Sequence, residues 1–251
     1  MNLNFQQILR FPLNRDDLDT TALGLSVVDH VDTTTKHKVM DEILEYRDSD
    51  GIIQVYFDHS RPRIGDYLVI GQDKLSNLYL YKDPICCVNV LTLFYANGRG
   101  HELHETLDWV TKVLKNRAYT GGTYYYVGGD LFLFFLSRLL KISPEVRQHL
   151  EPMFKERIQE RFGVEADSLS LAARILAAIA VNIVDRRDLE TLLSMQCEDG
   201  SWGNSWFFKT PETAIKIRND GVTTAMSIHA IQQVEELTQT CNQTDQWKSY
   251  S

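Results

Sequence analysis

Residues 169–181 read LSLAARILAAIAV, and a helix formed by them would be apolar on nearly every side. Two further stretches have the same character, at 84–95 (PICCVNVLTLFY) and 130–140 (DLFLFFLSRLL). Each is too short to cross a bilayer, which takes about 20 apolar residues. A helix without a polar face must therefore be enclosed by other parts of the protein.

Helices with one wet face are predicted between these apolar segments. In 101–115 and 145–162 the apolar residues recur three or four positions apart, with charged residues between them. Weaker segments extend the alternation, as inner helices at 19–29 and 221–234 and as outer helices at 36–46 and 187–196. An inner ring of apolar helices inside an outer ring of amphipathic ones is an all-α fold, the α/α toroid. A helical bundle or an α-solenoid would give the same layering without closing a ring.

The connecting turns repeat as well. The segments 49–57 (SDGIIQVYF), 120–128 (TGGTYYYVG) and 198–208 (EDGSWGNSWFF) each place a glycine turn before an aromatic cluster. We expect one toroid domain over 14–236, between an N-terminal segment 1–13 and a polar tail 237–251. The chain supplies about ten helical segments, against about twelve in a closed double ring, which leaves open whether the ring is complete.

Composition narrows the classes of function. With 34 acidic against 26 basic residues the net charge is −8, which argues against general attraction to nucleic acid or anionic lipid. Any anionic ligand therefore needs a local cluster of Arg and Lys. No signal peptide or membrane-spanning segment is expected. The four cysteines form no disulfide framework, so we expect a reduced, cytoplasmic setting.

Residues 15–21 (RDDLDTT) gather three carboxylates and two hydroxyls just before an apolar helix. Such residues commonly cap a helix, because they bind its free backbone N–H groups and the helix dipole favours negative charge there. They also suit acid catalysis, if burial and a second carboxylate keep one Asp protonated. The helix N-terminus opposes this by favouring the ionised form, so burial would have to dominate.

Two motifs carry a resemblance to a known family. Residues 17–21 (DLDTT) resemble the DxDTT form of the acid motif of class II terpene cyclases, as found in drimane-type sesquiterpene cyclases. Residues 196–202 (QCEDGSW) are similar to the QxxDGSW repeat of the same α/α toroid superfamily. The likeness covers roughly 13–235 and is closest to the cyclase half of fungal fusions with a haloacid-dehalogenase-like phosphatase. It favours the catalytic interpretation of the aspartates.

The resemblance implies roles for individual residues. The middle carboxyl of the motif, Asp19, would protonate a terminal alkene, with Asp17 and the hydroxyls of Thr20 and Thr21 orienting it. An alkene is a weak base, so the acid must be neutral and shielded from water, and the carbocation must meet only apolar or aromatic walls. Of the aromatic residues on the repeated turns, Tyr124 and Trp206 are the candidates for substrate binding, and Trp202 is expected to be structural.

A prenyl diphosphate substrate, farnesyl diphosphate in the first place, needs a basic anchor. Arg61, Arg63 and Arg99 are the candidates, although the loops that carry them could equally be solvated surface. Protonation requires no cofactor, and Mg²⁺ is a candidate only for binding the diphosphate. No metal-ligating residues are predicted, since the histidines of 101–105 (HELHE) are not spaced as in HExxH.

The sequence departs from the resembling proteins in two places. We expect no phosphatase-like domain of the kind that usually precedes the motif, so the product is expected to keep its diphosphate or to pass to a separate phosphatase. Residues 65–82 (GDYLVIGQDKLSNLYLYK) are an insertion, which is either a tolerated surface loop or the translation of an unspliced intron. Two alternatives remain: a non-catalytic toroid that binds a prenyl chain or a phosphatase domain, and a protein-prenyltransferase-like β subunit with zinc.

Overall fold

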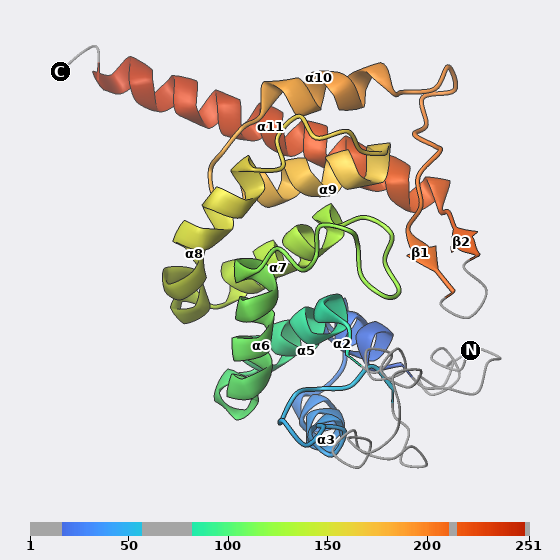
Figure 1. Ribbon diagram of the computed structural model, residues 1–251. Helices are drawn as coiled ribbons and strands as arrows, with labels where there is room; N and C mark the ends of the chain where they lie inside the picture. Colours follow the sequence, from blue (N-terminus) through green and yellow to red (C-terminus); the bar gives the residue numbers. More distant parts are fainter. Residues whose placement is uncertain (1–16, 57–81, 211–214, 249–251) are drawn as a thin grey trace. The chain divides into compact units, whose positions relative to one another are not determined.

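The computed structural model describes residues 17–56, 82–210 and 215–248 (Figure 1). These form two compact units. The first runs up to Asn116 and includes 142–144, whereas the second comprises 117–141 and the chain from Glu145 onward. The insertion predicted at 65–82 lies outside the described residues apart from Lys82.

The first unit is built around helix α5 (Pro84–Ala96). Every residue of α5 from Ile85 to Phe94 is buried, as predicted for an inner helix. Asp83 caps it by accepting the backbone N–H groups of the next turn, and Pro84 at its first position already has a helical φ. The other elements of this unit are α2 (Leu18–Val27), α3 (Thr33–Leu44), the 3₁₀ turn η4 (Gly100–Leu103) and α6 (His104–Lys115). Of these, α2, η4 and α6 pack around α5.

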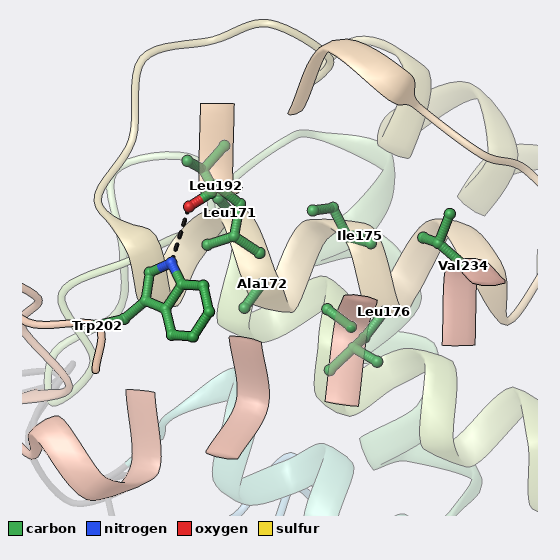
Figure 2. Packing of buried hydrophobic residues seen from close by; sticks show 8 residues of the cluster. Leu171, Ala172, Ile175, Leu176, Leu192, Trp202 and Val234 are labelled. Atoms are coloured by element: carbon green, nitrogen blue, oxygen red, sulfur yellow. Dashed lines mark hydrogen bonds between the residues drawn. The ribbon is translucent and has the colours of Figure 1, made fainter. Parts of the chain in front are cut away.

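The second unit is built around helix α9 (Ser168–Ile179), which is buried from Ser168 to Ala178 and packs against α10 and α11. Its cluster of Leu171, Ile175 and Leu176 is drawn in Figure 2. The remaining elements are α7 (Asp130–Ile142), α8 (Pro144–Gln159), α10 (Arg186–Ser194), the two-residue strands β1 (Phe208–Lys209) and β2 (Lys216–Ile217), and α11 (Asp220–Lys248).

The QxxDGSW turn supports this core. Trp202 is 2% exposed, and its indole N–H donates to the Leu192 carbonyl at 2.8 Å (Figure 2). Gly200 takes φ +85°, a left-handed conformation that side chains disfavour, and so lets the turn close. This burial and hydrogen bond agree with the structural role predicted for Trp202.

A buried ion network ties α7, α9 and α10 together. The Arg174 side chain is 0% exposed and donates to both Asp130 oxygens, at 3.2 and 3.0 Å, and to Asp188 at 2.9 Å. Arg161 makes a second bidentate pair with Asp130, at 2.9 and 3.0 Å. Although burial opposes it, these two guanidinium groups hold the pKa of Asp130 below its usual range.

Two helices differ from the expected inner type. On α2 a single stripe is buried, formed by Leu18, Asp19, Ala22 and Leu25. The described part of α11 likewise buries one stripe, formed by Thr223, Ser227, Ala230 and Val234. Both segments predicted as weaker inner helices, 19–29 and 221–234, thus pack against a buried helix, α2 on α5 and α11 on α9, but are covered on one side only. Helix α11 also continues to Lys248, so that most of the predicted tail 237–251 is helical.

Candidate active site

Asp17 is the N-cap of α2. Its Oδ1 accepts the Asp19 N–H at 2.7 Å and its Oδ2 accepts the Thr20 hydroxyl at 3.1 Å. The segment beside it is held in place because the Leu18 N–H donates to the Val55 carbonyl at 2.9 Å. The capping interpretation of the motif is therefore correct for Asp17.

Asp19 lies in the first turn of α2 and points to the interior. It is 9% exposed, and its Oδ1 accepts a 2.6 Å hydrogen bond from the side-chain amide of Asn89 on α5. Asn89 is itself 1% exposed and belongs to a helix that is otherwise nearly all apolar. A buried carboxyl with an oriented donor is what acid catalysis at this position requires.

The two carboxyls influence each other. Burial and the nearby Asp19 carboxylate raise the pKa of Asp17 to about 6, although the hydrogen bonds from the Asp19 N–H and the Thr20 hydroxyl act in the opposite direction. Burial, followed by the negative charge of Asp19, also raises the pKa of the Cys86 thiol. Cys86 precedes Asn89 by one helical turn on α5, so both lie on the side of α5 near Asp19. The surroundings of Asp19 thus contain a neutral thiol and an amide.

The two threonines take different places from those expected. Thr20 is exposed and donates to the Asp17 carboxyl, whereas Thr21 donates to the Asp17 backbone carbonyl at 2.8 Å. Both hydroxyls donate to Asp17, so they can influence Asp19 only through Asp17. The residue found beside Asp19 instead is Asn89, which the sequence analysis missed. Its signal was the single amide side chain within the apolar run 84–95.

Of the three arginines predicted to bind the diphosphate, only Arg99 lies within the described residues. Its guanidinium pairs with Glu102 at 2.5 Å and Asp41 at 2.7 Å, and these contacts raise its pKa. A diphosphate would have to compete with both carboxylates. Arg61 and Arg63 lie outside the described residues.

The aromatic candidates belong to the second unit, whereas Asp19 belongs to the first. Tyr124 is half-buried, with its ring edge-on to Tyr125 at 5.1 Å between centroids. Trp206 is 38% exposed, and the Lys216 ammonium lies 5.8 Å from its ring centre. Their role in substrate binding stays a prediction.

Neither a metal site nor a membrane span is found in the described parts of the chain. There, no group of three His, Cys, Asp or Glu side chains is arranged to hold a metal ion. No helix within the same ranges has the length and apolarity needed to span a bilayer.

Part of the chain that contains this site is similar to a known family of enzymes. Residues 5–97, which include both Asp19 and Asn89, match the family described as the sesquiterpene cyclase astC-like C-terminal domain. The match relates the chain to terpene cyclases, and an all-α toroid agrees with that relationship and with the helical structure of both units.

A particular relative can also be named. The chain is 40% identical over 218 residues to drimenol cyclase drtB of Aspergillus calidoustus. The alignment covers 86% of this chain and 38% of the relative, so the chain spans well under half of that protein's length. No solved structure matches the chain significantly.

Proposed function

We propose that the chain is a class II terpene cyclase, which cyclises a linear prenyl diphosphate by protonating its terminal double bond. Farnesyl diphosphate is the proposed substrate and a drimane-type skeleton the proposed product. The observation that carries the proposal is the buried Asp19 carboxyl, held by one amide at the start of a capped helix. The relative named as a drimenol cyclase supports the choice of substrate and skeleton.

We propose that the reactive form of Asp19 is the neutral acid, with its proton on the oxygen that does not accept from Asn89. An amide N–H donates to an oxygen that acts as acceptor, so Oδ1 is the carbonyl-like oxygen of neutral Asp19 and Oδ2 carries the proton. In the proposed step the Oδ2–H bond breaks and a C–H bond forms at the less substituted carbon of the terminal double bond, whose π electrons it uses, so that a tertiary carbocation is left. The resulting carbocation is attacked by the next double bond of the chain. Asn89 then donates to the carboxylate left behind, which stabilises it more strongly than the neutral acid.

The proximity of Asp17 opposes ionisation of the pair. Two neighbouring carboxyls resist carrying two negative charges, so the pair retains a proton at a higher pH than either alone. Because the pKa of Asp17 is raised to about 6, the pair holds one proton under mildly acidic conditions, and we propose that this proton is on Asp19 in the reactive form. Thr20 and Thr21 keep Asp17 in position and are proposed to act on Asp19 only through it.

The diphosphate is proposed to be bound by Arg61 and Arg63, with Arg99 available if its carboxylate partners are displaced. Carboxylic-acid protonation needs no metal. We therefore assign Mg²⁺ at most to the diphosphate group of the bound substrate.

The proposal is tested by incubating the purified chain with farnesyl diphosphate and, separately, with geranylgeranyl diphosphate. Extracts are analysed by mass spectrometry before and after phosphatase treatment, which shows whether the diphosphate is retained. A bicyclic sesquiterpene from farnesyl diphosphate is the expected result. Linear prenyl alcohol as the sole product, even after phosphatase treatment, would contradict it.

The same experiment separates the alternatives. Retained affinity for farnesyl diphosphate without cyclic product favours a toroid that only binds a prenyl chain or a phosphatase. A prenyltransferase-like subunit would instead require stoichiometric bound zinc, which metal analysis of the purified protein detects.

A further inference from the structure

Helix α7 carries one arginine within its apolar run. The residues from Leu131 to Leu140 are buried or half-buried, and Arg138 is half-buried among them. Its guanidinium carbon lies 5.9 Å from the centre of the Phe135 ring, within the range of a cation–π contact. Taking a charged group out of water costs free energy, so an arginine at this position suggests an electrostatic role.

The surroundings of Arg138 differ from those of two other arginines of the second unit. Arg161 and Arg174 both pair with Asp130, and this carboxylate raises the pKa of Arg161. Burial instead lowers the pKa of Arg138, so its surroundings disfavour the positive charge that an anionic ligand would stabilise. A guanidinium has five N–H donors, which allows Arg138 to bind an anion in addition to its existing contacts.

A cluster of aromatic rings adjoins Arg138. The Phe135 ring lies 6.0 Å from the Tyr126 ring, and Tyr126 is edge-on to Phe207 at 5.5 Å and to Phe208 at 6.1 Å. Phe207 and Phe208 are half-buried, so part of the cluster is accessible. The rings and Arg138 all belong to the second unit. Aromatic rings next to a guanidinium suit a ligand with an apolar chain and an anionic head.

We propose that Arg138 binds the diphosphate group of the prenyl substrate, with the adjoining aromatic cluster contacting the apolar chain. The inference rests on the proposed function, which supplies this substrate. Arginine can bind two phosphate oxygens through parallel N–H···O bonds, which adds directional specificity to the attraction of charge. Arg138 thus adds a residue of a largely buried helix to the loop arginines already proposed to bind the diphosphate.

Equilibrium binding of farnesyl diphosphate and of farnesol tests the inference. Farnesol has the same chain without the diphosphate, so the two dissociation constants together isolate the contribution of the head group. For Arg138→Gln we expect the Kd of farnesyl diphosphate to rise roughly tenfold or more, with the Kd of farnesol unchanged. Arg138→Lys keeps the charge but loses the paired N–H groups, so its Kd for farnesyl diphosphate should rise less.

The matched control is Arg147→Gln, which replaces a half-buried arginine of the same unit that pairs with Glu151 at 2.5 Å. This control should bind both ligands like the wild type, with circular dichroism showing that every variant is folded. An unchanged Kd of farnesyl diphosphate in Arg138→Gln would overturn the inference. Equal losses for farnesyl diphosphate and farnesol would overturn it too, because Arg138 would then act only by packing on Phe135.

Turnover measured on the same samples separates this inference from the proposed function. Cyclic product from a wild type whose affinity does not depend on Arg138 would refute only the role of Arg138. An affinity that depends on Arg138, without any cyclic product, would support that role and contradict the cyclase reaction. A wild type that binds no farnesyl diphosphate would contradict both.

Discussion

The contact between Asp19 and Asn89 joins residues far apart in the sequence. The local spacing in 17–21 predicts a capping carboxyl, and the resemblance to class II terpene cyclases predicts which carboxyl is the acid. The motif cannot predict which side chain faces Asp19, since the partner lies 70 positions along the chain and is fixed by the packing of α2 on α5. An amide within an apolar inner helix was the available signal, because a buried polar group must find a partner.

Replacing Asn89 by leucine should leave the fold intact and lower turnover of farnesyl diphosphate. A carboxyl that is no longer held loses orientation toward the alkene, so kcat is expected to fall roughly 10- to 100-fold with little change in KM. The matched control is Thr92→Val on the same helix, whose hydroxyl donates to the Val88 carbonyl at 2.8 Å. Equal effects of both changes on kcat would show that Asn89 has only a packing role.

Replacing Asp17 by asparagine should change how stability depends on pH. Because the fold raises the pKa of Asp17 from 3.8 to about 6, its favourable contribution is complete below pH 4 and is lost as the pH rises through 6. Asparagine remains a good cap and does not ionise. The variant should therefore gain on the order of 1–3 kcal/mol relative to wild type between pH 4 and 7, measured by urea unfolding.

Asp32, the cap of α3, provides the opposite case. Hydrogen bonds from the Thr35 hydroxyl and N–H lower the pKa of Asp32, so its contribution is lost as the pH falls. Asp32→Asn should accordingly lose stability relative to wild type as the pH rises. A difference of the same sign for the two variants would contradict the raised pKa of Asp17.

At the scale of elements, the helices that were predicted best are those that are buried over most of their length. The apolar runs 84–95 and 130–140 correspond closely to α5 and α7, because a helix apolar on all sides has only one stable environment. Helix α11 was predicted too short, since its apolar pattern ends near Val234. Nothing stops it there, because residues 222–248 contain neither glycine nor proline.

The ion network around Arg174 was not predicted, because its partners come from three helices and a connecting turn. Arg174→Met should destabilise the second unit by about 3–5 kcal/mol, since Asp130 and Asp188 would each lose a partner in the interior. Urea unfolding measures the loss. Arg117→Met is the control, as Arg117 pairs with Glu160 at an exposed position and should change little. A small effect at Arg174 would mean that Arg161 alone satisfies Asp130.

At the scale of the whole molecule, composition and helix pattern indicate the fold class, and the motif indicates the chemistry. The residues that bind the diphosphate could not be predicted from composition, helix pattern or motif. Arginines in loops have no periodic pattern. Arg99 illustrates the difficulty, because it pairs with Glu102, which is close in the sequence, and also with Asp41, which is far from it in the sequence. Pocket shape determines product stereochemistry and depends on side-chain placement that no motif records.

The most direct test of the account is the rate of cyclic product formation from farnesyl diphosphate by the wild type and by Asp19→Asn. An amide has nearly the shape of the carboxyl but cannot donate the required proton. The account predicts a loss of at least about 10³-fold for Asp19→Asn, with unchanged circular dichroism, whereas Asp32→Asn retains the wild-type rate. Unchanged turnover by Asp19→Asn would remove Asp19 from the reaction and contradict the proposed mechanism.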